Sequence, residues 1–455
     1  MIGPSINRFV PRPGSLGART IRAGLWSLVQ VGALHVLRLG SNLIMTRLLV
    51  PEAFGLIALV GTVVTAFALF SDIGISRSIV RERDGADPYF LQAAWTVKIL
   101  RGGIIAGGVL VAALLLGLLG PRLAAEGTVY ADPRLPWLIA ISAFAPFMQG
   151  FESTKRELAL RRIQMGRLSA VEIGAQVTSI TAMVVFASLS PTVWALLAGM
   201  LVNFAAKSAG SHLFLPGPSM RLIWDAEIAD RLWQFGKWLM GSSIFTFFAR
   251  NADRFILGAL LPAGAFGIYV IARIWIDAGQ QVIQRLGDQV GFSTIGEVIR
   301  DRPADAARLY RKFQTVMDVL CLSAALALFV LGQPLIDLLY TETYAEAGSY
   351  LRILALGLLA LRFDPLNGLV MNIGNSRAMM GISALRAAAL CVSLPLAYDA
   401  FGLTGALFAV ALSPLASVPL TLWVLRPVLG RQLVLDAAWV GLILAMAAAT
   451  GLFSG

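Results

Sequence analysis

The chain has 455 residues, of which 57% are hydrophobic and only 14% are charged, and its mean hydropathy is +0.76. A soluble protein usually carries about 25% charged residues, so this composition excludes a soluble protein and indicates a polytopic membrane protein. The net charge of +11 does not indicate a nucleic-acid partner, because the basic residues recur in short loops instead of forming one patch.

The N-terminal region, residues 1–22, is polar and basic and is predicted to lie in the cytoplasm. The apolar run that follows is too long for the core of a cleavable signal peptide, so we expect a retained first helix. Both cysteines, Cys321 and Cys391, fall in later apolar runs, which argues against a disulfide framework.

Apolar runs of membrane-spanning length follow along the whole chain, since crossing the hydrocarbon takes about 20 residues. They lie at residues 23–48, 54–76, 91–119, 135–153, 168–189, 192–215, 233–260, 264–284, 312–338, 347–373, 378–399, 403–425 and 432–453. The sequence therefore predicts an all-α polytopic membrane protein with about 13 (12–14) transmembrane helices.

The loop charges support this set of spans. With the N-terminus inside, the inside connections carry most of the loop Lys and Arg, as the positive-inside rule predicts. The outside connections "VPEAF", "LSPT" and "PAGA" carry none, and only Arg122 and Arg134 depart from the pattern. No connection is long enough for a soluble domain. The largest, residues 285–311, is charged, and its C-terminal part is expected to form a short helix on the inner membrane surface.

A short internal repeat relates the two halves of the chain. "TRLLVPEAFGLIALV" (46–60) resembles "GALLPAGAFGIYVIA" (258–272), and an offset of 212 residues aligns Phe54 with Phe266 and Gly55 with Gly267. Chance convergence of apolar sequence is the alternative explanation. A true repeat over six helices predicts two parallel six-helix lobes around a central cavity. The predicted lobes are residues 23–215 and 233–425, joined by a cytoplasmic linker at 216–232 and followed by an extra C-terminal transmembrane helix within 426–455.

Charges inside the spans are the strongest functional signal. Arg250, Asp253 and Arg254 lie three and four residues apart on one helical stripe. A charge at the bilayer centre costs about 2.5–3.5 kcal/mol, so the stripe should face the interior of the bundle or a hydrated cavity. His35, Arg38 and Asn42 share one face of the first span in the same way.

Basic residues outnumber acidic residues among the charges considered in these spans. The basic residues are Arg38, Lys98, Arg101, Arg250, Arg254, Arg273, Arg352 and Arg362, and the acidic ones are Asp253, Asp277 and Asp364. A surplus of cations around a cavity favours an anionic ligand, and the guanidinium fork suits phosphate oxygens.

Several of these residues also have a structural explanation. Arg273 and Asp277 form an i,i+4 pair typical of helix stabilisation, and Lys98 and Arg352 fit side chains that reach an interface. His35 fits either a polar contact between helices, which we favour, or a proton-linked group. The candidate substrate-binding residues are Arg38, Arg250, Arg254, Asp253, His35, Asn42, Arg273 and Arg362. The candidate coupling-ion residues are Asp253, Asp277 and Asp364.

The stretches "NLIMTRLLVPEAFGLIALV", "SDIGISRSIVRE" and "LWQFGKWLMGSSIFTFFARNADRFILGALLPAGAFGIYVIA" resemble the oligosaccharide flippases of bacterial polysaccharide biosynthesis, within the multidrug/oligosaccharidyl-lipid/polysaccharide exporter superfamily. "VWALLAGMLVN" and "GLTGALFAV" extend the resemblance, which covers residues 23–425. "GFSTIGEV" (291–298) departs from the family pattern because it lacks a proline that is usual there.

The resemblance implies a substrate carried on a polyprenyl pyrophosphate and moved to the outer leaflet of the bacterial cytoplasmic (inner) membrane by alternating access. Arg38, Arg250, Asp253 and Arg254 would then lie in the central cavity. The implied partners are the lipid-linked oligosaccharide and the lipid bilayer, and the resemblance leaves open whether other membrane proteins of polysaccharide assembly also bind.

Two other functions remain open at this point. A multidrug exporter of the same superfamily would share the fold, although cationic drugs favour acidic and aromatic cavities over arginine. A membrane polysaccharide polymerase or glycosyltransferase would need catalytic groups on a sizeable outside loop. The sequence contains no Walker motif, metal-ligand spacing or nucleophile triad signature, so we expect a non-enzyme without cofactor or metal.

Overall fold

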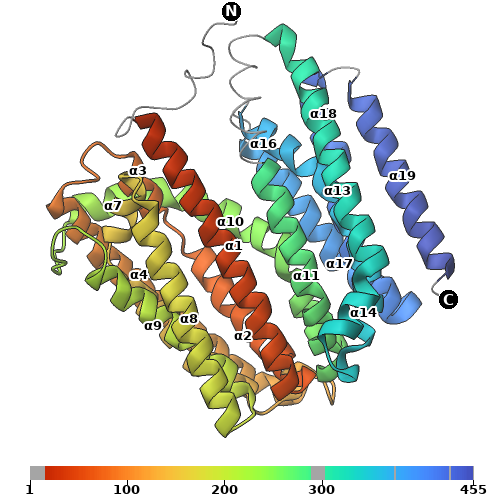
Figure 1. The fold of residues 1–455 in the computed structure, drawn as a ribbon, viewed down its shortest axis with the longest axis horizontal. Coiled ribbons are helices and arrows are strands. Elements are labelled where there is room, and N and C mark those ends of the chain that lie inside the picture. Colours follow the sequence, from red (N-terminus) through yellow and green to blue (C-terminus); the bar gives the residue numbers. More distant parts are fainter. Residues whose placement is uncertain (1–15, 288–302, 373–375, 430–431, 454–455) are drawn as a thin grey trace, which may run out of the picture. The chain divides into compact units, whose positions relative to one another are not determined.

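The computed structural model describes residues 16–287, 303–372, 376–429 and 432–453 (Figure 1). Most of the basic N-terminus, the first part of the expected surface helix and the "GFSTIGEV" stretch lie outside these residues. The rest of the expected surface helix, residues 303–313, forms the start of the long helix α13 (Pro303–Leu339). The described chain is almost entirely helical, and its strand-like pairing is an isolated antiparallel bridge between Thr128 and Pro262. The predicted all-α class is confirmed.

The chain divides into two compact units that we describe separately. Unit 1 comprises Met1–Leu49, Val63–Leu123 and Pro133–Gly241, and unit 2 comprises Val50–Thr62, Ala124–Asp132 and Ser242–Gly455. Two helices, α2 and α10, contribute residues to both units. The predicted lobe boundaries stay a prediction.

The first half of the chain forms helices that mostly belong to unit 1. They are α1 (Leu16–Leu48), α2 (Pro51–Phe70), α3 (Ile75–Arg81), α4 (Pro88–Leu123), η2 (Val129–Ala131), α5 (Leu135–Ser142), α6 (Phe144–Gly150), α7 (Lys155–Arg161), α8 (Met165–Leu189), α9 (Val193–Leu213) and α10 (Ala226–Leu260). Within unit 1, α8 packs along both α1 and α9, and α4 packs along α6.

The second half forms the remaining helices of unit 2. They are α11 (Ala263–Gly287), α13 (Pro303–Leu339), η4 (Glu342–Tyr344), α14 (Glu346–Ala355), α15 (Gly357–Ala360), η5 (Leu361–Phe363), α16 (Asp364–Asn372), α17 (Ser376–Leu412), η6 (Ser413–Ser417), α18 (Val418–Leu429) and α19 (Gln432–Phe453). In this unit α14 contacts α11, α13 and α17, so it occupies the middle of the packing.

The long helices carry the apolar surface that a bilayer requires. Within the described residues, eight helical stretches are long and apolar enough to cross a membrane, and Leu135–Gly150 and Ala438–Ala449 are shorter apolar helices. Large side chains such as Ile104, Leu114 and Leu118 of α4 are more than half exposed, which suits contact with lipid. The chain is a multi-pass membrane protein, and the number of thirteen crossings stays a prediction.

Several predicted spans contain breaks. The run at 135–153 is divided at Ala143, between α5 and α6, and the run at 347–373 is divided into α14, α15, η5 and α16. The separation predicted between 399 and 403 corresponds to Gly402, whose φ of 62° interrupts α17. Only glycine adopts this backbone conformation readily, so the helix changes direction there.

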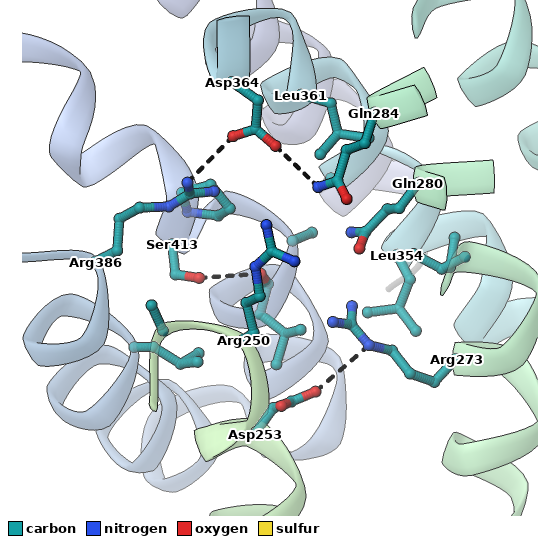
Figure 2. A pocket seen from close by; sticks show the side chains of 17 residues that line it. Arg250, Asp253, Arg273, Gln280, Gln284, Leu354, Leu361, Asp364, Arg386 and Ser413 are labelled. Carbon is teal, nitrogen blue, oxygen red and sulfur yellow. Dashed lines mark hydrogen bonds and ion pairs between the residues drawn. The ribbon is translucent and has the colours of Figure 1, made fainter. Parts of the chain in front are cut away.

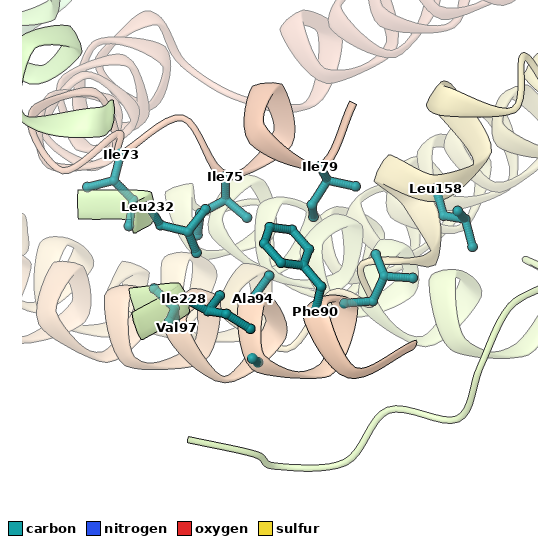
Figure 3. Packing of buried hydrophobic residues seen from close by; sticks show 11 residues of the cluster. Ile73, Ile75, Ile79, Phe90, Ala94, Val97, Leu158, Ile228 and Leu232 are labelled. Carbon is teal, nitrogen blue, oxygen red and sulfur yellow. The ribbon is translucent and has the colours of Figure 1, made fainter. Parts of the chain in front are cut away.

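An apolar cluster holds the short helices of unit 1 in place (Figure 3). Phe90 and Leu91 of α4 lie against Ile75 and Ile79 of α3 and Leu158 of α7, and all five are nearly inaccessible. Burial of a side chain of this size contributes about 1.5–3 kcal/mol. The cluster therefore fixes α3 and α7 beside α4 although neither short helix is stable by itself.

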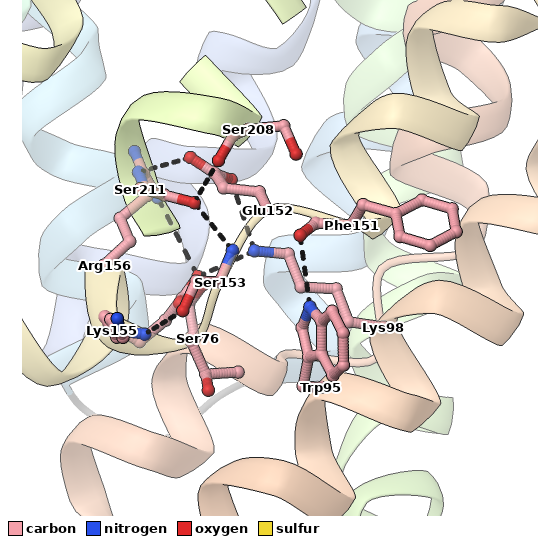
Figure 4. Close-up of polar contacts among 12 residues, drawn as sticks. Ser76, Trp95, Lys98, Phe151, Glu152, Ser153, Lys155, Arg156, Ser208 and Ser211 are labelled. Atoms are coloured by element: carbon pink, nitrogen blue, oxygen red, sulfur yellow. Dashed lines mark hydrogen bonds and ion pairs between the residues drawn. The ribbon is translucent and has the colours of Figure 1, made fainter. Parts of the chain in front are cut away.

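Buried charges of unit 1 neutralise one another nearby (Figure 4). Lys98 Nζ lies 3.2 Å from Glu152 Oε2 and 3.4 Å from Glu157 Oε1. Glu172 pairs with Arg156 at 3.3 Å and with Lys207 at 2.8 Å. Lys98 is thus held by carboxylates inside the unit and does not extend to an interface.

Candidate functional site

The candidate site is a polar pocket of unit 2 that surrounds Arg250 (Figure 2). Arg250 of α10 lines two cavities of about 60 Å³ and about 260 Å³. Gln284 of α11, Asp364 of α16 and Arg386 of α17 line both cavities as well, so we treat them together as the Arg250 pocket. Four elements that are distant in sequence therefore meet around one guanidinium group.

The predicted stripe on α10 holds three charges in three different environments. Arg250 is exposed and extends into the pocket, whereas Asp253 is only 1% exposed and Arg254 is partly buried. The spacing of three and four residues places them on one side of the helix. Their differing burial separates the residue available to a ligand from those engaged in packing.

Asp253 begins a chain of alternating charges between α10 and α11. It accepts a hydrogen bond from the Tyr269 hydroxyl and lies 3.6 Å from Arg273 Nε. Arg273 Nε is 3.3 Å from Asp277 Oδ1, and Asp277 Oδ2 is 3.0 Å from Arg254 Nη2. Two cations and two anions balance in this chain, so it stabilises the α10–α11 contact without providing surplus charge.

Asp364 is engaged at the opposite side of the pocket. Its Oδ1 lies 3.2 Å from Arg386 Nη1, and its Oδ2 accepts a hydrogen bond of 3.0 Å from Gln284 Nε2. Asp364 begins α16 directly after the 3₁₀ turn η5. This break in the helix turns the carboxylate toward α11 and α17.

Arg250 has no hydrogen-bond or ion-pair partner among the residues that the structure describes. The nearby Ser413 hydroxyl donates instead to the Val410 carbonyl oxygen, at 3.2 Å. The ionisable residues that line the pocket are Arg250, Asp253, Arg273, Asp364 and Arg386. Three cations and two anions leave the pocket with a charge of +1, which favours an anionic ligand.

Arg362 does not join the Arg250 pocket. Its side chain is 2% exposed, and it pairs with Asp318 of α13 at 2.5 Å and with Asp436 of α19 at 3.0 Å. Trp439 stacks over it, with the guanidinium carbon 4.8 Å from the ring centroid. These residues line a separate cavity of about 390 Å³. Arg362 therefore connects α19 to α13, and its predicted substrate role receives no support from this position.

The candidate residues of the first span lie on α1 in unit 1. The Arg38 side chain is exposed and has no partner among the described residues, whereas His35 and Asn42 are half-buried and make contacts. Arg101, another cation of unit 1, donates to the carbonyl oxygens of Ser71 and Ala68 at 2.6 Å each. Arg38 and Arg250 thus remain available to a ligand, each within its own unit.

Arg386 and several acidic partners lie outside the residues that the sequence singles out. Arg386 interrupts the apolar run at 378–399, and this interruption is the sequence signal that identifies it. Asp318, Asp436, Glu152 and Glu157 were also outside the count, and they neutralise Arg362 and Lys98. The predicted cation surplus is therefore much smaller than expected, and in unit 2 it centres on Arg250.

Comparisons with known proteins agree with this architecture. A family model described as "Polysaccharide biosynthesis protein" matches residues 44–349. The lipopolysaccharide biosynthesis protein WzxC of Escherichia coli (strain K12) is 25% identical over 363 residues, which cover 78% of this chain and 70% of WzxC. The succinoglycan biosynthesis transport protein ExoT of Rhizobium meliloti (strain 1021) is 23% identical over 348 residues, covering 75% and 67% respectively.

Two solved structures show the same fold at low sequence identity. The lipid II flippase MurJ in an inward closed conformation aligns with a TM-score of 0.69 and 11% identity, covering 95% of this chain and 93% of that one. An inward-facing multidrug resistance transporter of the MATE family, in the MOP superfamily, aligns with a TM-score of 0.66 and 16% identity, covering 87% and 94%. The fold is thus that of MOP superfamily transporters.

Proposed function

Because the chain belongs to the polysaccharide biosynthesis protein family, we propose that it is a flippase for a saccharide carried on a polyprenyl pyrophosphate. It moves the head group from the cytoplasmic to the outer leaflet of the bacterial inner membrane, with its own N-terminus in the cytoplasm. The similarity to the succinoglycan biosynthesis transport protein ExoT and the MurJ-like fold support this proposal. The positive inside connections support the orientation.

The proposal depends on one observation, which is that the Arg250 side chain has no partner among the described residues. A guanidinium group without a described partner, in a pocket of charge +1, is suited to bind phosphate oxygens in a bidentate manner. Arg386 lines the same pocket but already binds Asp364. Arg250 therefore binds the pyrophosphate within unit 2, and Arg38 is a separate candidate cation of unit 1.

The polyprenyl tail stays in lipid while the head group moves, so the protein needs to enclose only the polar part of the substrate. An inside-negative potential favours the inward return of an emptied cationic site, because a charge that crosses 100 mV changes in energy by about 2.3 kcal/mol. Asp253, Asp277 and Asp364 remain the candidates for coupling to a cation. Each already has an arginine partner, so a coupling cation would compete with that pair.

A multidrug exporter is the second candidate, because the MATE fold is also similar. Organic cations are repelled by a pocket whose lining sums to +1. We therefore favour the anionic substrate, and we propose a transporter and not a polymerase or glycosyltransferase. Competition between organic cations and a polyprenyl-pyrophosphate saccharide separates the two transport functions.

The direct test measures head-group movement across reconstituted liposomes. Arg250→Ala should lower the rate at limiting substrate about tenfold or more, since a hydrogen bond to a charged group contributes about 1.5–3 kcal/mol. Arg250→Lys should retain part of the rate, because it keeps the charge and loses the fork. The matched control is Arg352→Ala, which removes an exposed arginine of α14 that lines neither cavity. Equal rates for Arg250→Ala and Arg352→Ala in folded protein would contradict the proposed site.

A further inference from the structure

Helix α19 meets α13 beside a cavity of unit 2 that lies apart from the Arg250 pocket. Both helices begin at the same end of the unit (Figure 1), and α19 packs mainly along α18. The cavity has a volume of about 390 Å³ and is lined by residues of α13, η5 and α19. We call it the α19 notch. A single water occupies about 30 Å³, so the notch has room for a ligand much larger than a bridging water.

The charges that line the α19 notch balance one another but differ in their access to a ligand. Arg311 and Arg362 are the cations, and Asp318 and Asp436 are the anions. The side chains of Arg362 and Asp436 are 2% and 3% exposed and pair with each other at 3.0 Å. Asp318 also pairs with Arg362 but keeps 21% of its side chain exposed, and Arg311 is exposed. The notch therefore presents one accessible carboxylate and one accessible guanidinium group, and this pattern complements a zwitterion.

The wall of the notch also contains two buried polar atoms that have no hydrogen-bond partner in the part of the chain that the structure describes. They are Arg362 Nη1, which is a donor, and Gln314 Oε1, which is an acceptor. The amide nitrogen of Gln314 is already engaged, since it donates to the Arg362 carbonyl oxygen at 2.9 Å. Buried polar groups normally have partners. A ligand with both acceptor oxygens and N–H donors matches this wall, whereas an acyl chain does not.

The position of the notch along α13 suits the head group of a membrane lipid. The basic residues of segment 308–312 begin the notch, and the positive-inside rule predicts that they lie at the cytoplasmic interface. Trp439 lines the notch, and tryptophan is enriched at such interfaces. Farther along α13, Val319, Leu322 and Leu326 are all more than 40% exposed. A lipid bound by its head group in the notch can therefore lay its acyl chains on this apolar face.

We propose that the α19 notch binds a phospholipid whose head group is phosphoethanolamine, and that this lipid bridges α13 and α19. Arg311 binds the phosphate oxygens, as guanidinium groups do, and the Asp318 carboxylate accepts hydrogen bonds from the primary ammonium. These two residues are seven positions apart, so they lie on one face of α13 about two turns from each other. A choline head group has no N–H to donate, and a glycerol head group has no cation for Asp318.

The first experiment measures which lipids the detergent-purified protein retains in native mass spectrometry. The protein is mixed with phosphatidylethanolamine, phosphatidylcholine or phosphatidylglycerol that carry identical acyl chains. The wild type should retain phosphatidylethanolamine about fivefold more than either other lipid, because only this head group makes charged hydrogen bonds at both ends. In thermal unfolding, the same lipid should raise the midpoint of the wild type more than phosphatidylcholine does, since a ligand of the folded state stabilises it.

Two variants test the notch without changing the buried pairs of Arg362. Arg311→Gln removes the proposed phosphate ligand, and Thr315→Trp fills the notch from an exposed position of α13 that lines it. Both should abolish the preference for phosphatidylethanolamine. The matched controls are Arg426→Gln, at an exposed arginine of α18, and Val316→Trp, at a position that is 56% exposed. Neither control position lines the notch, so both should retain the preference of the wild type.

Three outcomes overturn the lipid site. They are equal retention of the three lipids by the wild type, a preference for phosphatidylglycerol, and a preference for phosphatidylethanolamine that survives in the folded notch variants. If Thr315→Trp does not fold, Arg311→Gln and its control Arg426→Gln decide the question by themselves. None of these measurements requires movement of a saccharide, so the lipid site and the proposed transport function are tested separately.

Discussion

Replacing Asp364 with Asn should strengthen anion binding in the Arg250 pocket. Asp364 contributes one of the two negative charges that line the pocket, so Asp364→Asn raises the sum from +1 to +2. The larger cavity, of about 260 Å³, has the volume of a sphere about 8 Å across, so an anion bound there lies within about 8 Å of this carboxylate. Removal of a unit charge at that distance changes the energy by about 0.5–2 kcal/mol for effective dielectric constants between about 80 and 20.

The corresponding increase in affinity is about two- to thirtyfold. Isothermal titration calorimetry of the detergent-purified protein with inorganic pyrophosphate measures it, and the gain should shrink at high salt. Asp337→Asn is the matched control, since Asp337 pairs with Gln333 on α13 and lines neither cavity. A folded Asp364→Asn protein that binds pyrophosphate no more tightly than Asp337→Asn would refute the electrostatic argument.

Three further changes test the packing. Arg362→Ala should lower the free energy of unfolding by about 3–5 kcal/mol, because it leaves Asp318 and Asp436 without their shared cation; an unchanged thermal midpoint in detergent would contradict this. Lys98→Met should destabilise unit 1 similarly, and Glu157→Gln in the same chain should recover part of the loss if the cause is the buried charge. Gly102→Ala should lower the free energy of unfolding by about 1–3 kcal/mol, since its methyl group would lie 2.9 Å from Gly150 Cα. Gly103→Ala should leave it unchanged in the same unfolding assay, because its methyl group would have no atom within 4 Å.

The sequence predicts the positions of the helices well because hydropathy decides which segments enter lipid. It does not reveal the break at Ala143, since the residues there are as apolar as those around them. At Leu361–Phe363 the charge of Arg362 interrupts the apolar run, but a charge alone does not predict a 3₁₀ turn. Gly402 is an exception, because a glycine between two apolar runs signals a break. Local irregularities of an apolar helix depend on its neighbours in space, and one span does not contain that information.

The candidate site was predicted only in part for the same reason. Arg250 and Asp364 interrupt apolar runs, and both line the pocket. Arg362 also interrupts an apolar run, yet its side chain points toward α13 and α19. The 3₁₀ turn η5 directs the side chains of Arg362 and Asp364 to different sides. Its partner Asp436 lies 74 residues later in the chain, and composition alone cannot assign such a pair.

The attachment of α19 through Asp436 has a consequence for biogenesis. An ionised carboxylate makes an otherwise apolar helix less favourable to release into lipid by itself. Asp436 finds its guanidinium and the Tyr310 hydroxyl only when α13 and η5 are already in place. The exit of α19 from the translocon is therefore coupled to its docking on α13 and η5. A nascent chain that lacks Arg362 should stall at this step and be degraded.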